Sequence, residues 1–205
     1  MATWRFVNFD FKESELLADL SGIVSDLKSA SELCDLLTEQ IEKQPMNFKL
    51  IEALNCALLV KYARPFASGV RKRVPIDIIS ELPEEYQKDH EWFIGLRNKY
   101  IAHSVNSFEE NNVHAYLVPE ERGPKGISSI SVQENRMLCL GKDDISRIKR
   151  LAEEIAQKIT ALVEAERKNV LAFAKSFPPE DFYNQKLKPV KVPSRDDVNK
   201  SRRRR

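Results

Sequence analysis

The sequence predicts an all-α fold: a four- to five-helix bundle with a small β-hairpin insertion between the third and fourth long helices. Apolar residues recur at helical spacing in four segments, and the pattern changes to alternation between the last two of them. Prolines follow three of these segments closely. The 205 residues, 42% hydrophobic and 31% charged, suffice for one soluble globular domain with its own core.

The first helix is predicted from about residue 13 to residue 43. Ser21 and Gly22 allow a bend near its middle. Gln44-Pro45 ends it, because the residue before a proline avoids helical backbone angles. Its apolar residues step by alternating intervals of four and three and so share one side of the helix: Leu16, Leu20, Ile23, Leu27, Ala30, Cys34, Leu37 and Ile41.

The second helix is predicted to begin after Asn47, a candidate N-cap, and to end at residue 62 or 63. A connector with three prolines follows, and its isoleucines at 76, 78 and 79 are expected to dock on the core. The third helix is predicted from about Pro83, which suits a first helical turn, to about residue 103. The core face of the second helix is predicted to hold Phe48, Ile51, Leu54, Leu58 and Tyr62.

The insertion is predicted at about residues 113–140. Residues 114–118, 127–133 and 136–140 are short runs of β-forming residues. Glu134-Asn135 separates the last two runs and predicts a tight turn, whereas residues 119–126 predict a loop. Two or three strands are therefore expected. The fourth helix is predicted from about Asp143 to Ser176, where Pro178-Pro179 stops it.

Residues 1–176 are predicted to form the bundle and residues 177–205 a flexible basic tail. The total charge of +2 is the sum of two segments with opposite net charge. Nine basic and two acidic residues lie in 186–205, so that segment carries +7 and residues 1–185 carry −5. A uniformly basic nucleic-acid-binding body is thereby excluded, although local basic patches are not.

Several classes of protein lack their signatures here. No apolar run approaches the ~20 residues that cross a bilayer, so no membrane association is expected. Three separated cysteines favour a reducing, cytoplasmic compartment and no structural zinc. The six glycines form neither a dinucleotide-binding nor a P-loop pattern. We therefore expect no metal and no cofactor.

The candidate catalytic residues lie in the stretch RNKYIAHS, residues 97–104. Arg97 offers a permanent cation with forked donors suited to a phosphate, and His103 can exchange protons near neutral pH. Six positions on an ideal helix set these side chains about 120° apart. They can converge on one cleft if the helix ends or loosens near residue 102.

This stretch resembles the signature of the HEPN superfamily, in which an arginine and a polar residue are followed by a histidine late in the third helix of a bundle. The form found here is most similar to HEPN proteins of bacterial abortive-infection and toxin–antitoxin systems. The resemblance implies a metal-independent endoribonuclease that leaves 2′,3′-cyclic phosphate and 5′-hydroxyl ends. It implies that His103 handles the ribose 2′-hydroxyl, Arg97 stabilises the scissile phosphate and Asn98 orients one of them.

The resemblance also implies partners. HEPN sites form across a homodimer, with two motif copies facing one cleft, and single-stranded RNA is the expected substrate. A cognate antitoxin or another regulatory protein is a further expected partner. Residues expected to bind substrate are Lys99, Ser104, Arg64, Arg71 and Arg73.

One alternative stays open from the same resemblance. Many HEPN-like domains have no nuclease activity and serve as dimerisation modules or as modules that bind a partner protein or a nucleotide. An acidic body is unhelpful for RNA binding, which favours this alternative. The basic cluster at residues 71–73 also suits a solvated connector.

Overall fold

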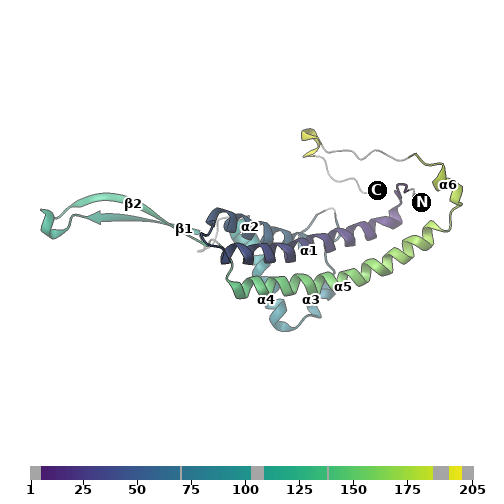
Figure 1. Ribbon diagram of the computed structural model, residues 1–205, viewed down its shortest axis with the longest axis horizontal. Coiled ribbons are helices and arrows are strands. Elements are labelled where there is room, and N and C mark those ends of the chain that lie inside the picture. Colours follow the sequence, from purple (N-terminus) through teal and green to yellow (C-terminus); the bar gives the residue numbers. More distant parts are fainter. Residues whose placement is uncertain (1–5, 70, 103–108, 138, 187–193, 200–205) are drawn as a thin grey trace.

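The computed structural model describes residues 6–69, 71–102, 109–137, 139–186 and 194–199. Its order of elements confirms a mostly helical fold with an antiparallel hairpin between α4 and α5 (Figure 1). The elements are α1 (Glu15–Glu42), α2 (Phe48–Ala63), α3 (Ile76–Ser80), α4 (Glu84–Leu96), β1 (Glu109–Leu117), β2 (Ile127–Arg136), α5 (Lys142–Ala174) and α6 (Pro179–Tyr183).

Four long helices enclose one core. α1 packs along α5 and against α2, and α4 lies against both α2 and α5. The predicted seam of α1 is confirmed, because six of its eight residues are buried and the outer two, Leu16 and Ile41, pack partly buried against the core. The matching stripe of α5 is buried as well: Ile145, Ile148, Leu151, Ala152, Ile155, Ala156, Ile159 and Val163.

Helix α1 is continuous through Ser21 and Gly22, where a bend was allowed. Gly22 instead makes room for a side chain from the connector: a Cβ added there would lie 3.0 Å from Arg71 Nη1. The start of α2 is as predicted, since Asn47 Oδ1 accepts a hydrogen bond of 3.1 Å from the Leu50 amide.

Two predictions about buried residues were wrong. Phe48 is 57% exposed because it lies in the first turn of α2, ahead of the first buried residue, Ile51. Ile76 is 81% exposed because the short helix α3 has only one inward face, which Ile78 fills.

The predicted turn at Glu134-Asn135 was also wrong. These residues lie within β2 and pair with Asn111 and Glu110 of β1. The chain reverses instead between the strands, where Gly123 has φ 142°, a conformation that favours glycine. The residues predicted as a loop therefore form the tip of one long, two-stranded hairpin.

A second, aromatic cluster joins the segment before α1 to the end of α5 and the segment after it. Phe9 and Phe11 precede α1, Phe173 lies in the last turn of α5, and Phe177 and Phe182 follow it. Ring centroids lie 5.2 Å apart for Phe11 and Phe177 and 5.9 Å apart for Phe9 and Phe182. The first residues of the predicted tail therefore pack against the body.

Candidate functional site at the end of α4

Helix α4 ends in a widened turn that includes the start of the RNKYIAHS stretch. Residues Arg97–Ile101 form a π-helical turn, closed by a 2.9 Å hydrogen bond from the Ala102 amide to the Arg97 carbonyl. Such i→i+5 turns are rare and often lie at functional sites. The predicted loosening of the helix thus begins five residues earlier than residue 102.

The widened turn is fixed to the base of the hairpin. The Tyr100 hydroxyl donates to the Met137 carbonyl, just after β2, and Ile101 packs against the core. The same connection is tied to α2, because the Leu140 amide donates to the buried Asn55 Oδ1 over 3.1 Å. An ion pair of 3.3 Å between Arg136 and Glu52 adds a second tie.

The site side chains lie at the surface of this turn. Arg97 is half-buried and its Nη1 donates a 3.0 Å hydrogen bond to Asn98 Oδ1, while Asn98 and Lys99 are exposed. No ion pair joins Arg97 or Lys99 to a carboxylate within the described residues. Their positive charge is thus available to an anionic ligand. His103 and Ser104 lie outside the described residues.

The other predicted cations have a different environment. Asp26, whose side chain is 6% exposed on α1, is contacted by Arg71 at 2.9 Å, Lys61 at 3.3 Å and Arg64 at 3.4 Å. The Lys72 amide donates to Asp19 Oδ2, about two turns before Asp26 on α1. These contacts attach the connector between α2 and α3 to the bundle.

The Asp26 cluster is remote from the end of α4. Helix α4 runs antiparallel to α2: His90 contacts Tyr62 near the end of α2, whereas Tyr100 approaches the hairpin base near Asn55. Arg64 and Arg71 therefore lie toward the opposite end of α2 from Arg97. Arg73 is exposed on the connector. The structure brings Arg97, Asn98 and Lys99 together and leaves the other predicted cations in the described chain, Arg64, Arg71 and Arg73, elsewhere.

His90 belongs to the aromatic core. Its Nδ1 shares a 2.8 Å hydrogen bond with the Tyr62 hydroxyl, and its ring lies 4.5 Å from that of Phe66. Burial lowers the pKa of His90 to about 4, and burial raises the pKa of Tyr62 above its ordinary value. His90 is therefore neutral at pH 7 and structural.

The free energy of unfolding should depend on the protonation of His90. The unfolded histidine takes up its proton near pH 6.5 and the folded one near pH 4, so stability is lost as the pH falls through that window. Because the ring is partly exposed, we expect the free energy of unfolding to fall by about 2 kcal/mol between these limits, which is less than the full pKa shift would give. Urea unfolding at several pH values measures it. His90→Gln should flatten the profile, and His114→Gln on the exposed hairpin should not.

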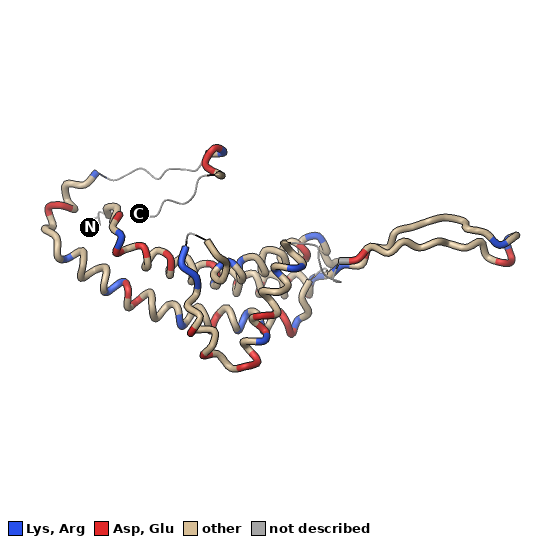
Figure 2. Tube along the Cα trace, turned by 180° about the vertical axis from the view of Figure 1, so that it is seen from behind, with Lys and Arg blue, Asp and Glu red and all other residues tan. Residues whose placement is uncertain are grey.

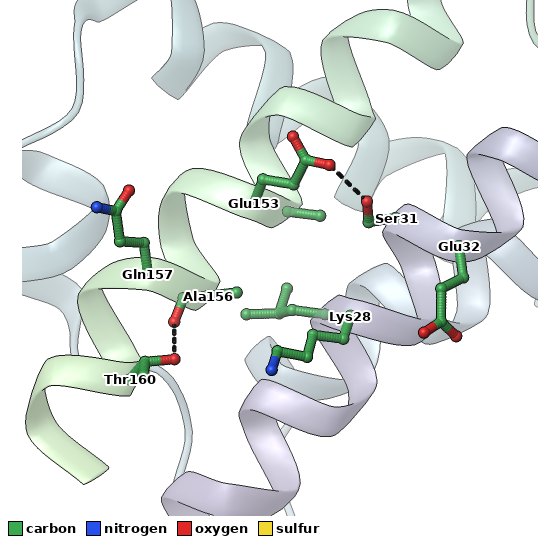
Figure 3. A pocket seen from close by; sticks show the side chains of 9 residues that line it. Lys28, Ser31, Glu32, Glu153, Ala156, Gln157 and Thr160 are labelled. Atoms are coloured by element: carbon green, nitrogen blue, oxygen red, sulfur yellow. Dashed lines mark hydrogen bonds between the residues drawn. The ribbon is translucent and has the colours of Figure 1, made fainter. Parts of the chain in front are cut away.

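An open groove lies on another face, between α1 and α5 (Figure 3). It has a volume of about 480 Å³ and a floor of Leu27, Ala152 and Ala156. Its rim polar groups are partly paired, since Ser31 Oγ donates to Glu153 Oε1 over 2.7 Å. None of the site residues predicted from the sequence lines this groove.

Comparisons with known proteins add no assignment. No family model, no curated protein and no solved structure matches the chain. Within the described part of the chain, no group of His, Cys, Asp and Glu side chains could hold a metal ion. In that same part, no helix has both the length and the apolar character of a membrane span.

Proposed function

We propose that this protein is a metal-independent endoribonuclease of a bacterial defence or toxin–antitoxin type, acting on single-stranded RNA across a homodimer cleft. The observation that carries the proposal is the pairing of Arg97 with Asn98 on a π-helical turn. Arg97 keeps a forked cation at the surface, without a carboxylate partner among the described residues, where a phosphate could be bound. His103 follows in sequence as the group that takes the proton from the ribose 2′-hydroxyl.

The contrast between the two groups of arginines supports this assignment. The Arg71 side chain is only 20% exposed and its guanidinium donates to the buried Asp26 carboxylate, so that donor is not directed at a phosphate in solution. Lys99 lies exposed in the turn next to Arg97. Arg97 and Lys99 thus place positive charge at the end of α4, although the body as a whole is acidic.

The chemistry of the product ends tests the proposal. Purified protein would be incubated with single-stranded RNA in EDTA, and the fragment ends identified by mass spectrometry. Fragments with 2′,3′-cyclic phosphate and 5′-hydroxyl ends are expected, since no metal-bound water is required. Intact RNA, or cleavage that EDTA abolishes, would reject the proposed reaction.

The basic segment 186–205 should contribute to RNA affinity without sequence preference. Deleting it removes a charge of +7, so binding should weaken and its dependence on salt should become shallower. Fluorescence anisotropy with a labelled RNA at several salt concentrations measures both effects. A variant with Gln in place of the nine basic residues controls for chain length. Unchanged affinity and salt dependence in both variants would show that the segment plays no part in binding.

The alternative function is a non-catalytic dimerisation module or a module that binds a protein or a nucleotide. The exposed apolar surface of the hairpin specifically favours a role in protein interaction. A chain that forms dimers and cleaves no RNA would support this alternative.

A further inference from the structure

The hairpin has one apolar and one polar face. Directly opposed residues point to the same side of a two-stranded sheet, and the register pairs Val113 with Val132, Ala115 with Ile130 and Leu117 with Ile127. The other side holds Asn112 opposite Gln133, His114 opposite Ser131 and Tyr116 opposite Ser129. We call the first set, residues 113, 115, 117, 127, 130 and 132, the hairpin apolar face.

This face is uncovered in the single chain. Its five larger side chains are each about 60–70% exposed, from Val132 at 59% to Leu117 at 71%. The strands contact each other along their length and project away from the helices (Figure 1). An isolated two-stranded hairpin is marginally stable in water, and a clean apolar face is typical of a sheet that packs on something.

We propose that the hairpin apolar face packs on the same face of a second copy of this chain, with both hairpins pointing in the same direction. The charge distribution disfavours nucleic acid and a membrane as occupants. Residues 109–136 contain five acidic and three basic residues, which opposes nucleic acid binding. Figure 2 shows these charges at the base and the tip, with none along the middle of the strands. A charged tip opposes insertion into a membrane.

The face is complementary to itself when both hairpins point in the same direction. When a two-fold axis runs parallel to the strands, β1 of one copy lies over β2 of the other. The large Ile130 then sits over the small Ala115 in both copies, and Val113 lies over Val132. The next rung places the Asn111 amide opposite the Glu134 carboxylate, a favourable pairing. A two-fold axis that crosses the strands at the level of Ala115 would instead place Ala115 over Ala115 and leave a void.

The buried area also favours hairpins that point the same way. Nine paired residues at about 3.4 Å each, on two strands about 4.8 Å apart, give one whole side of the hairpin, with the hairpin apolar face and the polar rungs at its base, an area of roughly 300 Å² once side-chain width is included. Two such faces bury about 600 Å², against about 1,200–2,000 Å² for a stable interface. Parallel hairpins bring both bundle ends together and so permit further contact, whereas antiparallel hairpins hold the bundles apart.

This inference deepens the proposed function. The role of the hairpin dimer in RNA cleavage rests on that proposed function. The hairpin base is fixed to the turn that carries Arg97, through Tyr100 and Met137. Parallel packing therefore brings two Arg97 turns to the same end of the assembly, where a cleft with two motif copies requires them.

The oligomeric state is measured by analytical ultracentrifugation of the full chain. The wild type should sediment as a dimer at micromolar concentration. Ile130→Asp with Val132→Asp should weaken the dimer at least ~100-fold by placing unpaired charges in the interface. Ser131→Asp, on the polar face between them, should leave the dimer unchanged. Far-UV circular dichroism should show folded helices in all three proteins, because the hairpin is outside the core.

The direction of the hairpins is measured by cross-linking at the tip. In a Cys56→Ser, Cys139→Ser background, Lys125→Cys should form a covalent dimer with a short bismaleimide, because parallel tips are adjacent. Adding Ile130→Asp should abolish that product. A monomeric wild type, or a dimer without the tip cross-link, overturns the inference. Neither readout involves RNA, so a cross-linked dimer that cleaves nothing would reject the proposed function alone.

Discussion

Asp26→Ala is expected to lower the free energy of unfolding by about 3–5 kcal/mol. The carboxylate is buried in α1 and contacts three cations, of which Arg71 has a side chain only 20% exposed. Removing Asp26 leaves that guanidinium partly desolvated without a counter-charge. Urea unfolding followed by circular dichroism measures the change.

An exposed ion pair between the same types of residue provides the control. Asp35 of α1 pairs with Lys149 of α5, but the Asp35 side chain is 64% exposed. Asp35→Ala should therefore cost less than about 1 kcal/mol. If Asp26→Ala costs no more than Asp35→Ala, the Asp26 cluster does not hold the connector in place.

Arg97→Ala is expected to reduce the rate of RNA cleavage by about 100- to 1,000-fold. The guanidinium is proposed to stabilise charge that develops on the scissile phosphate, and loss of one such donor has an effect of that size. Single-turnover cleavage of a labelled RNA measures the rate. Arg97→Lys should recover only part of it, because an ammonium keeps the charge but loses the forked geometry.

An arginine outside the proposed site gives the matched control. Arg167 is exposed on α5 and pairs with Glu164 in the same helix. Arg167→Ala should cleave RNA at the wild-type rate. Its unfolding temperature should equal that of Arg97→Ala, so that a difference in cleavage is not a difference in stability. Equal cleavage by the Arg97 and Arg167 variants would remove Arg97 from the reaction.

The helices were predictable because their signals are local. Apolar residues spaced by three and four positions indicate a helix with one buried face, and in α1 six of the eight residues predicted on that face are buried. Asn47 likewise reports the start of α2 from its own side chain. The hairpin was predicted in outline, but Glu134-Asn135 resembled a turn only locally. Pairing with β1 holds these residues extended.

The features that the sequence did not reveal depend on contacts between distant residues. Asp26 contacts cations that lie 35 to 45 positions later in the sequence, and no local sequence pattern predicts these contacts. The phenylalanines near both ends of the described chain join for the same reason. The π-helical turn at Arg97 has no periodic signature, since it is fixed by the tertiary contact from Tyr100 to Met137.

The most direct measurement of the central claim is cleavage of one single-stranded RNA in EDTA by wild type, Arg97→Ala and His103→Ala at equal concentration, each shown to be folded by circular dichroism. Wild type should release 2′,3′-cyclic phosphate ends, and both variants should do so at least ~100-fold more slowly. Equal cleavage by all three proteins, or no cleavage by any, would contradict the assignment of ribonuclease activity to the RNKYIAHS stretch.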